Sequence, residues 1–288
     1  MKKLFLTLAT LAMTFAFVGC DIIDKDNTLL PAPAPVGPGG TETPTEIDIT
    51  QTHEDRYVLA EDFTGQKCLN CPKGHKKLAD LKAQYGNRLT VVAIHAGSES
   101  LVPPLFRTEA GNAYFAQLAN NANLPALMVS RRKFGTSYVY DKSYKTWDAP
   151  IGEQMQEKAQ MNVFAVAEYT DAQKIKVTVK GKVLEGNSIP AAKVLVYLLE
   201  DKVIASQVDG GTTIENYEHN HVLRGAVNGI WGEDFVDLKD YVYTYTVEPL
   251  AGMPFVAENY SIVAFVYNAE TYEVFDVVQV GINPQSVK

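Results

Sequence analysis

Residues 61–78, EDFTGQKCLNCPKGHKKL, contain two cysteines, Cys68 and Cys71, separated by two residues and followed at once by Pro72. The apolar stretch before the cysteines predicts a strand, and the stretch after them predicts a helix that opens with proline and ends at Gly86. The pair therefore lies where a strand passes into a helix. Unpaired backbone N–H groups and the helix dipole at such a point favour a thiolate on the first cysteine.

The same C-x-x-C spacing serves redox couples, half of a zinc site and static structural disulfides. A zinc site needs two further ligands. The chain has only one other cysteine, so those ligands would have to come from scattered histidines: His75, His95, His219 and His221. We therefore predict no metal at this pair, and no cofactor, while a redox couple and a static disulfide both stay open.

The N-terminus predicts a lipoprotein signal peptide over residues 1–19. Lys2 and Lys3 precede an apolar run that is shorter than the ~20 residues of a comfortable membrane span. The run ends in Gly19-Cys20, which resembles a bacterial lipobox and implies a lipid on Cys20 that anchors the chain to the membrane. If Cys20 carries lipid, the remaining cysteines form an even pair.

Residues 20–56 are rich in Pro, Gly, Thr and acidic residues, so we expect a flexible, extended tether. We therefore place the protein in the cell envelope, lipid-anchored in the outer membrane. Asp21, Asp24 and Asp26 look like an export tag to the cell surface, although a solvated tether explains them equally. The formal net charge of −8 with no basic run excludes a nucleic-acid partner.

Two fold patterns follow the tether. Residues 57–160 alternate between strand and helix patterns, which is typical of an α/β domain. Residues 161–288 contain seven stretches that alternate apolar and polar side chains, with turn residues between them. The second pattern predicts an antiparallel β-sandwich of immunoglobulin-like shape. The predicted fold class is thus α/β plus all-β, with a boundary at residues 160/161.

The first domain resembles the thioredoxin superfamily through its C-x-x-C and through the third strand, LPALMVSRR, which Pro125 introduces. The resemblance implies that Cys68 is the nucleophile, that Cys71 is the resolving thiol, and that a cis Pro125 with the Leu124 backbone forms a docking edge for a substrate peptide. Lys67 stands where thioredoxins usually have Trp. Glu61 and Asp62 are the candidates for proton handling.

The stretch NYEHNHVLRGAVNGIWGEDF, residues 216–235, interrupts the alternation of the second domain. An H-x-H pair on a strand places both rings on one face, so His219 and His221 could hold a metal. We favour instead a long loop or bulged hairpin that packs Trp231 on the sandwich. Trp, Tyr and Arg are also typical of a protein-binding patch, which keeps an interaction role open.

Together, EDFTGQKCLNCPKGHKKL, LPALMV and HNHVLRGAVNGIWGE resemble the family of outer-membrane lipoproteins related to a 28-kDa outer membrane protein. The resemblance implies a thioredoxin-like domain followed by a β-sandwich. We expect thiol–disulfide exchange between the Cys68/Cys71 pair and exported proteins, which would make the chain a thiol–disulfide oxidoreductase. The alternative is a non-catalytic surface binding or adhesion lipoprotein in which the pair is a structural disulfide.

Overall fold

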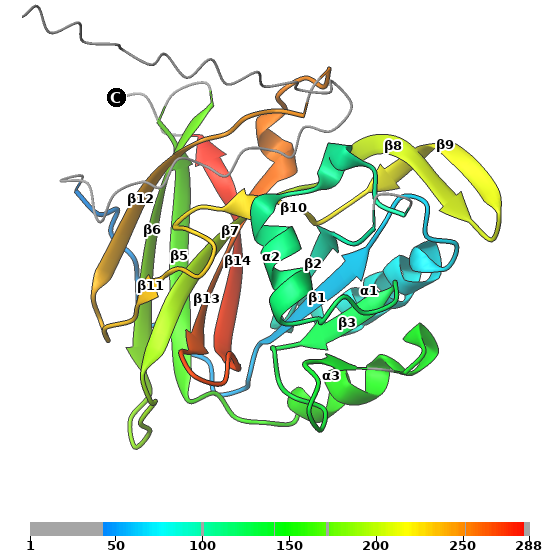
Figure 1. Ribbon diagram of the computed structural model, residues 1–288. Helices are drawn as coiled ribbons and strands as arrows, with labels where there is room; N and C mark the ends of the chain where they lie inside the picture. The colour runs from blue at the N-terminus through cyan, green and yellow to red at the C-terminus, as the bar shows by residue number, and fades with distance from the viewer. Residues whose placement is uncertain (1–42, 99–100, 141, 171–172, 251, 285–288) are drawn as a thin grey trace, which may run out of the picture.

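The computed structural model of the 288-residue chain describes residues 43–98, 101–140, 142–170, 173–250 and 252–284 (Figure 1). The predicted signal peptide, the lipidation site Cys20 and the tether up to residue 42 lie outside the described residues. Within the described ranges, no helix combines the length and the apolar composition that crossing a membrane requires.

Strands dominate the described part of the chain, and helices are few, which confirms the coarser part of the predicted fold class. The α-helices are α1 (Cys71–Tyr85), α2 (Glu109–Gln117) and α3 (Asp148–Gln154). The strands of the first half are β1 (Val58–Thr64), β2 (Leu89–His95), β3 (Ala126–Val129) and β4 (Val139–Tyr140). Those of the second half are β5 (Met161–Tyr169), β6 (Lys174–Val183), β7 (Ala192–Glu200), β8 (Val203–Asp209), β9 (Thr212–His219), β10 (Val222–Ala226), β11 (Glu233–Asp234), β12 (Asp240–Thr246), β13 (Tyr260–Asn268) and β14 (Val274–Pro284).

The first half forms a small sheet with helices on both faces. β1 pairs in parallel with β2 and antiparallel with β3. Alternate side chains of β1 enter different cores: Val58 and Ala60 pack with residues of α1 and α3, whereas Leu59 and Phe63 pack with residues of α2. Because both faces of β1 are covered, its burial is continuous, as expected for such a strand.

The sheet of the first half continues into the second half. β10 pairs in parallel with β2, and the Ala93 amide donates to the His221 carbonyl at 2.8 Å. The strand order in the described residues runs β12-β6-β5-β14-β13-β7-β10-β2-β1-β3-β4, with β11 beside β7. Figure 1 shows this passage from the β12–β6–β5 side of the molecule to the helices around β1. The boundary at 160/161 thus separates two element patterns that are joined by one hydrogen-bonded path, and the division into two domains stays a prediction.

β7 separates two large cores. Leu195, Tyr197 and Leu199 face the core that contains α2, and Val194 and Val196 face a core shared with β5, β6 and β12. The strands β5, β6 and β12 therefore pack through this second core against β7 and β13. The period-two pattern of the sequence predicted the strands, and burial of both faces explains why β7 is more apolar than a half-exposed strand.

Two local differences from the sequence expectations have simple causes. The helix that closes the predicted α/β pattern of residues 57–160 stops before residue 160, because α3 ends at Gln154 and β5 begins at Met161. The irregular stretch 216–235 contains the end of β9, all of β10 and the short β11. The segment contains a bulge, since the register of β10 against β7 shifts between Leu223 and Gly225, but it is neither the long loop nor the hairpin that was expected, because β10 lies between β7 and β2 in the long sheet.

Candidate functional site

Cys68 and Cys71 form a disulfide at the N-terminus of α1. Cys68 lies in the loop after β1, and Cys71 is the first residue of the helix, with Pro72 in the first turn. The two Cα atoms are 5.5 Å apart. The predicted position of the pair, between a strand and a helix start, is therefore the observed one. The exposed fraction is only 4% for Cys68 and 0% for Cys71, so an attacking thiolate has little access to either residue.

The loop before the disulfide is tightly packed. The Lys67 amide donates to the Leu101 carbonyl at 2.9 Å, although the Lys67 side chain is exposed. A Cβ on Gly65 would lie 2.7 Å from the Leu101 carbonyl oxygen and 2.7 Å from a methyl carbon of Val102. Only glycine allows this approach, and the contact fixes the path by which β1 leads into the C-x-x-C.

Pro125 packs against the helix that carries Cys71. The peptide bond between Leu124 and Pro125 is cis. Pro125 Cβ lies 3.5 Å from the position that a Cβ on Gly74 would occupy, and the Trp147 ring lies 3.0 Å from the same position. Gly74 is one turn from Cys71, so the start of β3 and the cysteine-bearing end of α1 are neighbours. The Leu124–Pro125 bond is thus cis, as expected, while the role of Pro125 and the Leu124 backbone as a docking edge stays a prediction.

The two acidic residues of β1 have opposite environments. Glu61 accepts hydrogen bonds from Arg131 Nε and Nη2, both at 2.9 Å, and from the Tyr197 hydroxyl at 3.0 Å. Asp62 is equally buried, but neither of its carboxyl oxygens has a hydrogen-bond partner in the described residues. Burial alone raises the pKa of Asp62 well above its ordinary value. Glu61 therefore forms a structural ion pair with Arg131, and Asp62 is the group able to hold a proton.

His75 lies on α1, one helical turn after Cys71, and its ring faces Asp62 of β1. Its Nε2 lies 3.7 Å from Asp62 Oδ2 and 2.7 Å from Thr64 Oγ1, and its Nδ1 lies 3.0 Å from the Tyr217 hydroxyl. Burial lowers the pKa of His75 to about 3, so the ring is neutral at physiological pH. A neutral imidazole and a protonated carboxyl can face each other without an uncompensated buried charge.

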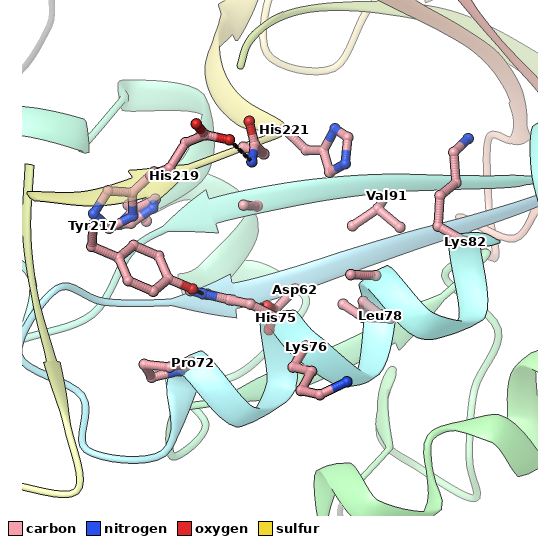
Figure 2. A pocket seen from close by; sticks show the side chains of 15 residues that line it. Asp62, Pro72, His75, Lys76, Leu78, Lys82, Val91, Tyr217, His219 and His221 are labelled. Carbon is pink, nitrogen blue, oxygen red and sulfur yellow. Dashed lines mark hydrogen bonds and ion pairs between the residues drawn. The ribbon is translucent and has the colours of Figure 1, made fainter. Parts of the chain in front are cut away.

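A pocket of about 250 Å³ opens between α1, β2 and the segment 217–221. Figure 2 shows Asp62, His75 and Tyr217 from three different elements facing one another in it, with Lys76 and Lys82 along the helix. Two other rings that line the pocket, those of His95 and His219, meet edge to face, with centroids 5.4 Å apart. Burial lowers the pKa of His219 to about 4 and that of His95 well below its ordinary value. The pocket walls around these rings are thus polar and uncharged.

The H-x-H pair is split. His219 ends β9 and packs against Phe106 and His95, whereas His221 has a positive φ of 57° and its Nδ1 lies 3.1 Å from Asp201 Oδ1. A left-handed residue after the strand turns the second ring away, so the expectation that both rings share one face is wrong. Across the described ranges, no group of three or more His, Cys, Asp or Glu side chains is arranged to hold a metal ion.

Trp231 was expected to pack on the sandwich, and it packs instead between α2 of the first half and the turn between β13 and β14. Its ring meets those of Tyr114 and Tyr272, with centroids 5.2 and 5.7 Å away. Both partners belong to the core that contains α2 or lie on its border. Trp231 is therefore part of the protein's own packing, and this weakens the interpretation of 216–235 as a binding patch.

The sequence interpretation did not place two groups beside the pair: His75, which it named only as a possible zinc ligand, and Tyr217. His75 is four residues after Cys71, a spacing that places both on one helix face, and this signal was available. Tyr217 gave no signal, because it reaches the site from a hairpin distant in the sequence. Sequence patterns do not report which loop of one half covers the other half.

Comparisons with known proteins agree on a family. The sequence profile of the family described as outer membrane protein Omp28 matches residues 113–286. A solved domain of the outer membrane lipoprotein Omp28 from Porphyromonas gingivalis is 66% identical over 44% of this chain and 100% of that chain, with a TM-score of 0.37. No curated protein matches the chain.

A second solved structure, HBP35 of Porphyromonas gingivalis, matches at 17% identity and a TM-score of 0.62, over 83% of this chain and 80% of that chain. At this identity the match supports a shared fold only. The profile match covers more than half of the chain, and the family confirms the predicted outer-membrane localisation. The chain belongs to the Omp28 family of outer membrane proteins.

Proposed function

We propose that this outer membrane protein exchanges thiols and disulfides with exported proteins through Cys68 and Cys71. The observation that carries the proposal is the Cys68–Cys71 disulfide at the start of α1, with Pro125 packed against the same helix. We assign residues 57–160 to a thioredoxin-like domain and residues 161–288 to an immunoglobulin-like sandwich. Cys20 carries the lipid in this proposal, and residues 20–56 tether the protein to the membrane.

The exchange proceeds in two balanced steps. A thiolate of the partner attacks Cys68 Sγ, the Cys68–Cys71 bond breaks, and its electron pair goes to Cys71 Sγ, which takes a proton. A second partner thiolate then attacks the mixed disulfide and releases Cys68, which also takes a proton. Two electrons and two protons pass from the partner dithiol to the pair, and the partner ends as a disulfide. The reverse sequence reduces a partner disulfide.

Asp62 is the group we assign to the proton of these steps. It is the buried carboxyl without a hydrogen-bond partner in the described part of the chain, and burial raises its pKa. A carboxyl that is protonated near neutral pH gives up its proton to a leaving thiolate more readily than water does. His75, 3.7 Å away, lies between Asp62 and Tyr217 and takes part in the same polar group.

The experiment is a trapping assay on the full-length protein in detergent. Cys71→Ser removes the resolving thiol, so the Cys68 thiolate should attack disulfides of oxidised exported proteins, and the resulting mixed disulfides should accumulate on Cys68. Cys68→Ser is the matched control, because it keeps one cysteine of the same pair but removes the attacking sulfur. Equal amounts of mixed disulfide on both variants, or none on either, would refute the proposal.

A non-catalytic surface-binding lipoprotein is the second candidate. The nearly complete burial of both sulfurs favours it, since a structural disulfide has no need of access. Two results together identify this function: the wild-type protein exchanges no disulfide with any exported protein, and added protease cleaves the protein on intact cells. A protein that faces the periplasm stays intact under the same protease treatment and cannot be an adhesin.

A further inference from the structure

The hairpin formed by β8 and β9 lies directly against the loop that carries the disulfide. It forms a separate two-stranded sheet, outside the long sheet. In Figure 1 it projects from the rest of the second half, and its turn reaches the loop before α1. The Gly210 amide in that turn donates to the Leu69 carbonyl at 3.0 Å. A segment from the second half of the chain thus covers the site in the first half.

Hydrogen bonds join residues 206–210 of the hairpin to the loop around Cys68. The Val208 amide donates to the Gln66 carbonyl at 2.7 Å. Gln207 Nε2 donates to the carbonyls of Gly65 at 3.2 Å and Cys68 at 3.4 Å. In return, Gln66 Nε2 donates to the Ser206 carbonyl at 3.1 Å. The main chain on both sides of Cys68 is therefore held by the hairpin.

The outer part of the hairpin is poorly anchored to anything else. Beyond residue 205, Gln207 is its only buried side chain before His219, and it is polar. Ile214 is 39% exposed, and the rest of β9 up to Asn216 is exposed as well. The base of the hairpin, where β8 begins, is held differently, since Val203 packs with Phe106 in a small apolar core. A register shift between Ala205 and Gln207 separates the two parts. Segments with few buried apolar contacts open locally at low cost.

We propose that the β8–β9 hairpin is a gate over the Cys68–Cys71 disulfide, and that its outer part must lift before a thiolate can reach Cys68. The inference rests on the proposed function, because a gate matters only at a site that reacts. In the closed form both sulfurs are buried, the hairpin holds the carbonyls on either side of Cys68, and the gate opens at the register shift after Ala205. Exchange is then limited by the fraction of molecules in the open form.

The test measures how fast dithiothreitol reduces the disulfide of the full-length protein in detergent. The reductant supplies two electrons and two protons and ends as a cyclic disulfide, and samples are quenched with acid and alkylated to count free thiols. Ala205 and Tyr217 are directly paired, so an Asn-Gly turn in place of residues 206–216 closes a shorter hairpin in register. This variant keeps the His75–Tyr217 contact and lacks the gate.

The shortened hairpin should raise the reduction rate roughly tenfold or more, because the route to Cys68 is always open. A point variant, Gln207→Leu, keeps the size of the side chain and removes the two hydrogen bonds that Gln207 donates to the cysteine loop, and it should raise the rate roughly fivefold. Ile214→Thr is the matched control on the same hairpin, and its rate should equal that of the wild type.

A rate within about twofold of wild type for Gln207→Leu, at an unchanged melting temperature, would overturn the gate whether or not the shortened variant folds. A failure of the proposed function gives a different combination of results from a failure of the gate. Faster reduction of both gate variants, combined with an absence of mixed disulfides on Cys71→Ser, would keep the gate and refute exchange with proteins. Unchanged reduction rates combined with trapped mixed disulfides would refute the gate and keep the exchange.

Discussion

Glu61 and Arg131 form a two-pronged ion pair whose side chains are entirely buried, with both N–O distances at 2.9 Å. Arg131 also lies over the rings of Tyr114 and Phe265, 4.9 and 5.1 Å from their centroids. Because Tyr197 of β7 donates to the same carboxyl, this pair ties the sheet of the first half to the second. The neighbouring Asp62 has no part in this ion pair and faces His75 instead.

Glu61→Gln should lower the free energy of unfolding by about 3–5 kcal/mol, because it leaves the Arg131 charge buried without a counter-charge. Chemical denaturation measures the change. The double variant E61L/R131M should lose less than the sum of the two single variants, since it removes both charges together. Asp80→Asn is the control: it breaks an exposed pair with Lys76 and should change stability by no more than about 0.5 kcal/mol.

Asp62→Asn should make the protein more stable than wild type at neutral pH. The folded-state pKa of Asp62 is raised, so the folded chain retains a proton that the unfolded chain loses. This penalty is absent below the unfolded pKa of ~3.9 and grows as the pH rises toward the folded pKa. The gain should therefore exceed about 1 kcal/mol at pH 7 and vanish near pH 4. A constant difference across this range would contradict a raised pKa.

The same substitution should slow disulfide exchange at neutral pH, because it removes the proton that the leaving thiolate of Cys71 receives. Stopped-flow mixing with a reduced partner protein measures the rate, and we expect a loss of roughly tenfold to a hundredfold. The substituted amide side chain would occupy nearly the same volume as the carboxyl, so a change in packing does not explain the loss. An unchanged rate would mean that Asp62 has no part in the exchange.

His219→Phe should reduce the loss of stability in mild acid. Burial lowers the folded-state pKa of His219 to about 4, so between about pH 6.5 and pH 4 only the unfolded chain takes up the proton. Stability therefore falls as the pH falls through this window, by on the order of 3 kcal/mol for this group. Phenylalanine fits the aromatic surroundings and does not titrate. The control, Phe106→Leu, disturbs the same ring cluster and should lower stability equally at all pH values.

Gly65→Ala should destabilise the protein by about 1–3 kcal/mol, since its Cβ would lie 2.7 Å from the Leu101 carbonyl oxygen. The loop before Cys68 would have to move, so disulfide reduction by dithiothreitol should become faster as well. Thermal unfolding and thiol counting measure the two effects. Gly281→Ala, which meets no atom within 4 Å, should leave both unchanged.

The sequence predicted most of the elements around the site, because their signals are local. The proline after Cys71, the glycine at residue 86 and the apolar run of β2 each report on their own segment. The same holds for Pro125 at the start of β3. The pairing of β10 with β2 was not predicted, because strands adjacent in space carry no mark of their neighbour in one sequence.

The parts of the site that depend on distant contacts could not be predicted either. Gln207 resembled any polar residue of a half-exposed strand, and only its side-chain bonds to the carbonyls of Gly65 and Cys68 reveal its position over the disulfide. The sequence left Glu61 and Asp62 equivalent. Arg131, which decides between them, is seventy positions away and has a positive φ of 50° that no pattern indicated.

The reduction potential of the Cys68–Cys71 couple tests the central claim most directly. The full-length protein in detergent is equilibrated with a series of dithiothreitol or glutathione buffers, and the reduced fraction is counted by alkylation. Disulfide exchange with exported proteins predicts a potential between about −270 and −120 mV, the range of proteins that exchange disulfides. A potential below about −300 mV, where structural disulfides lie, would contradict the account.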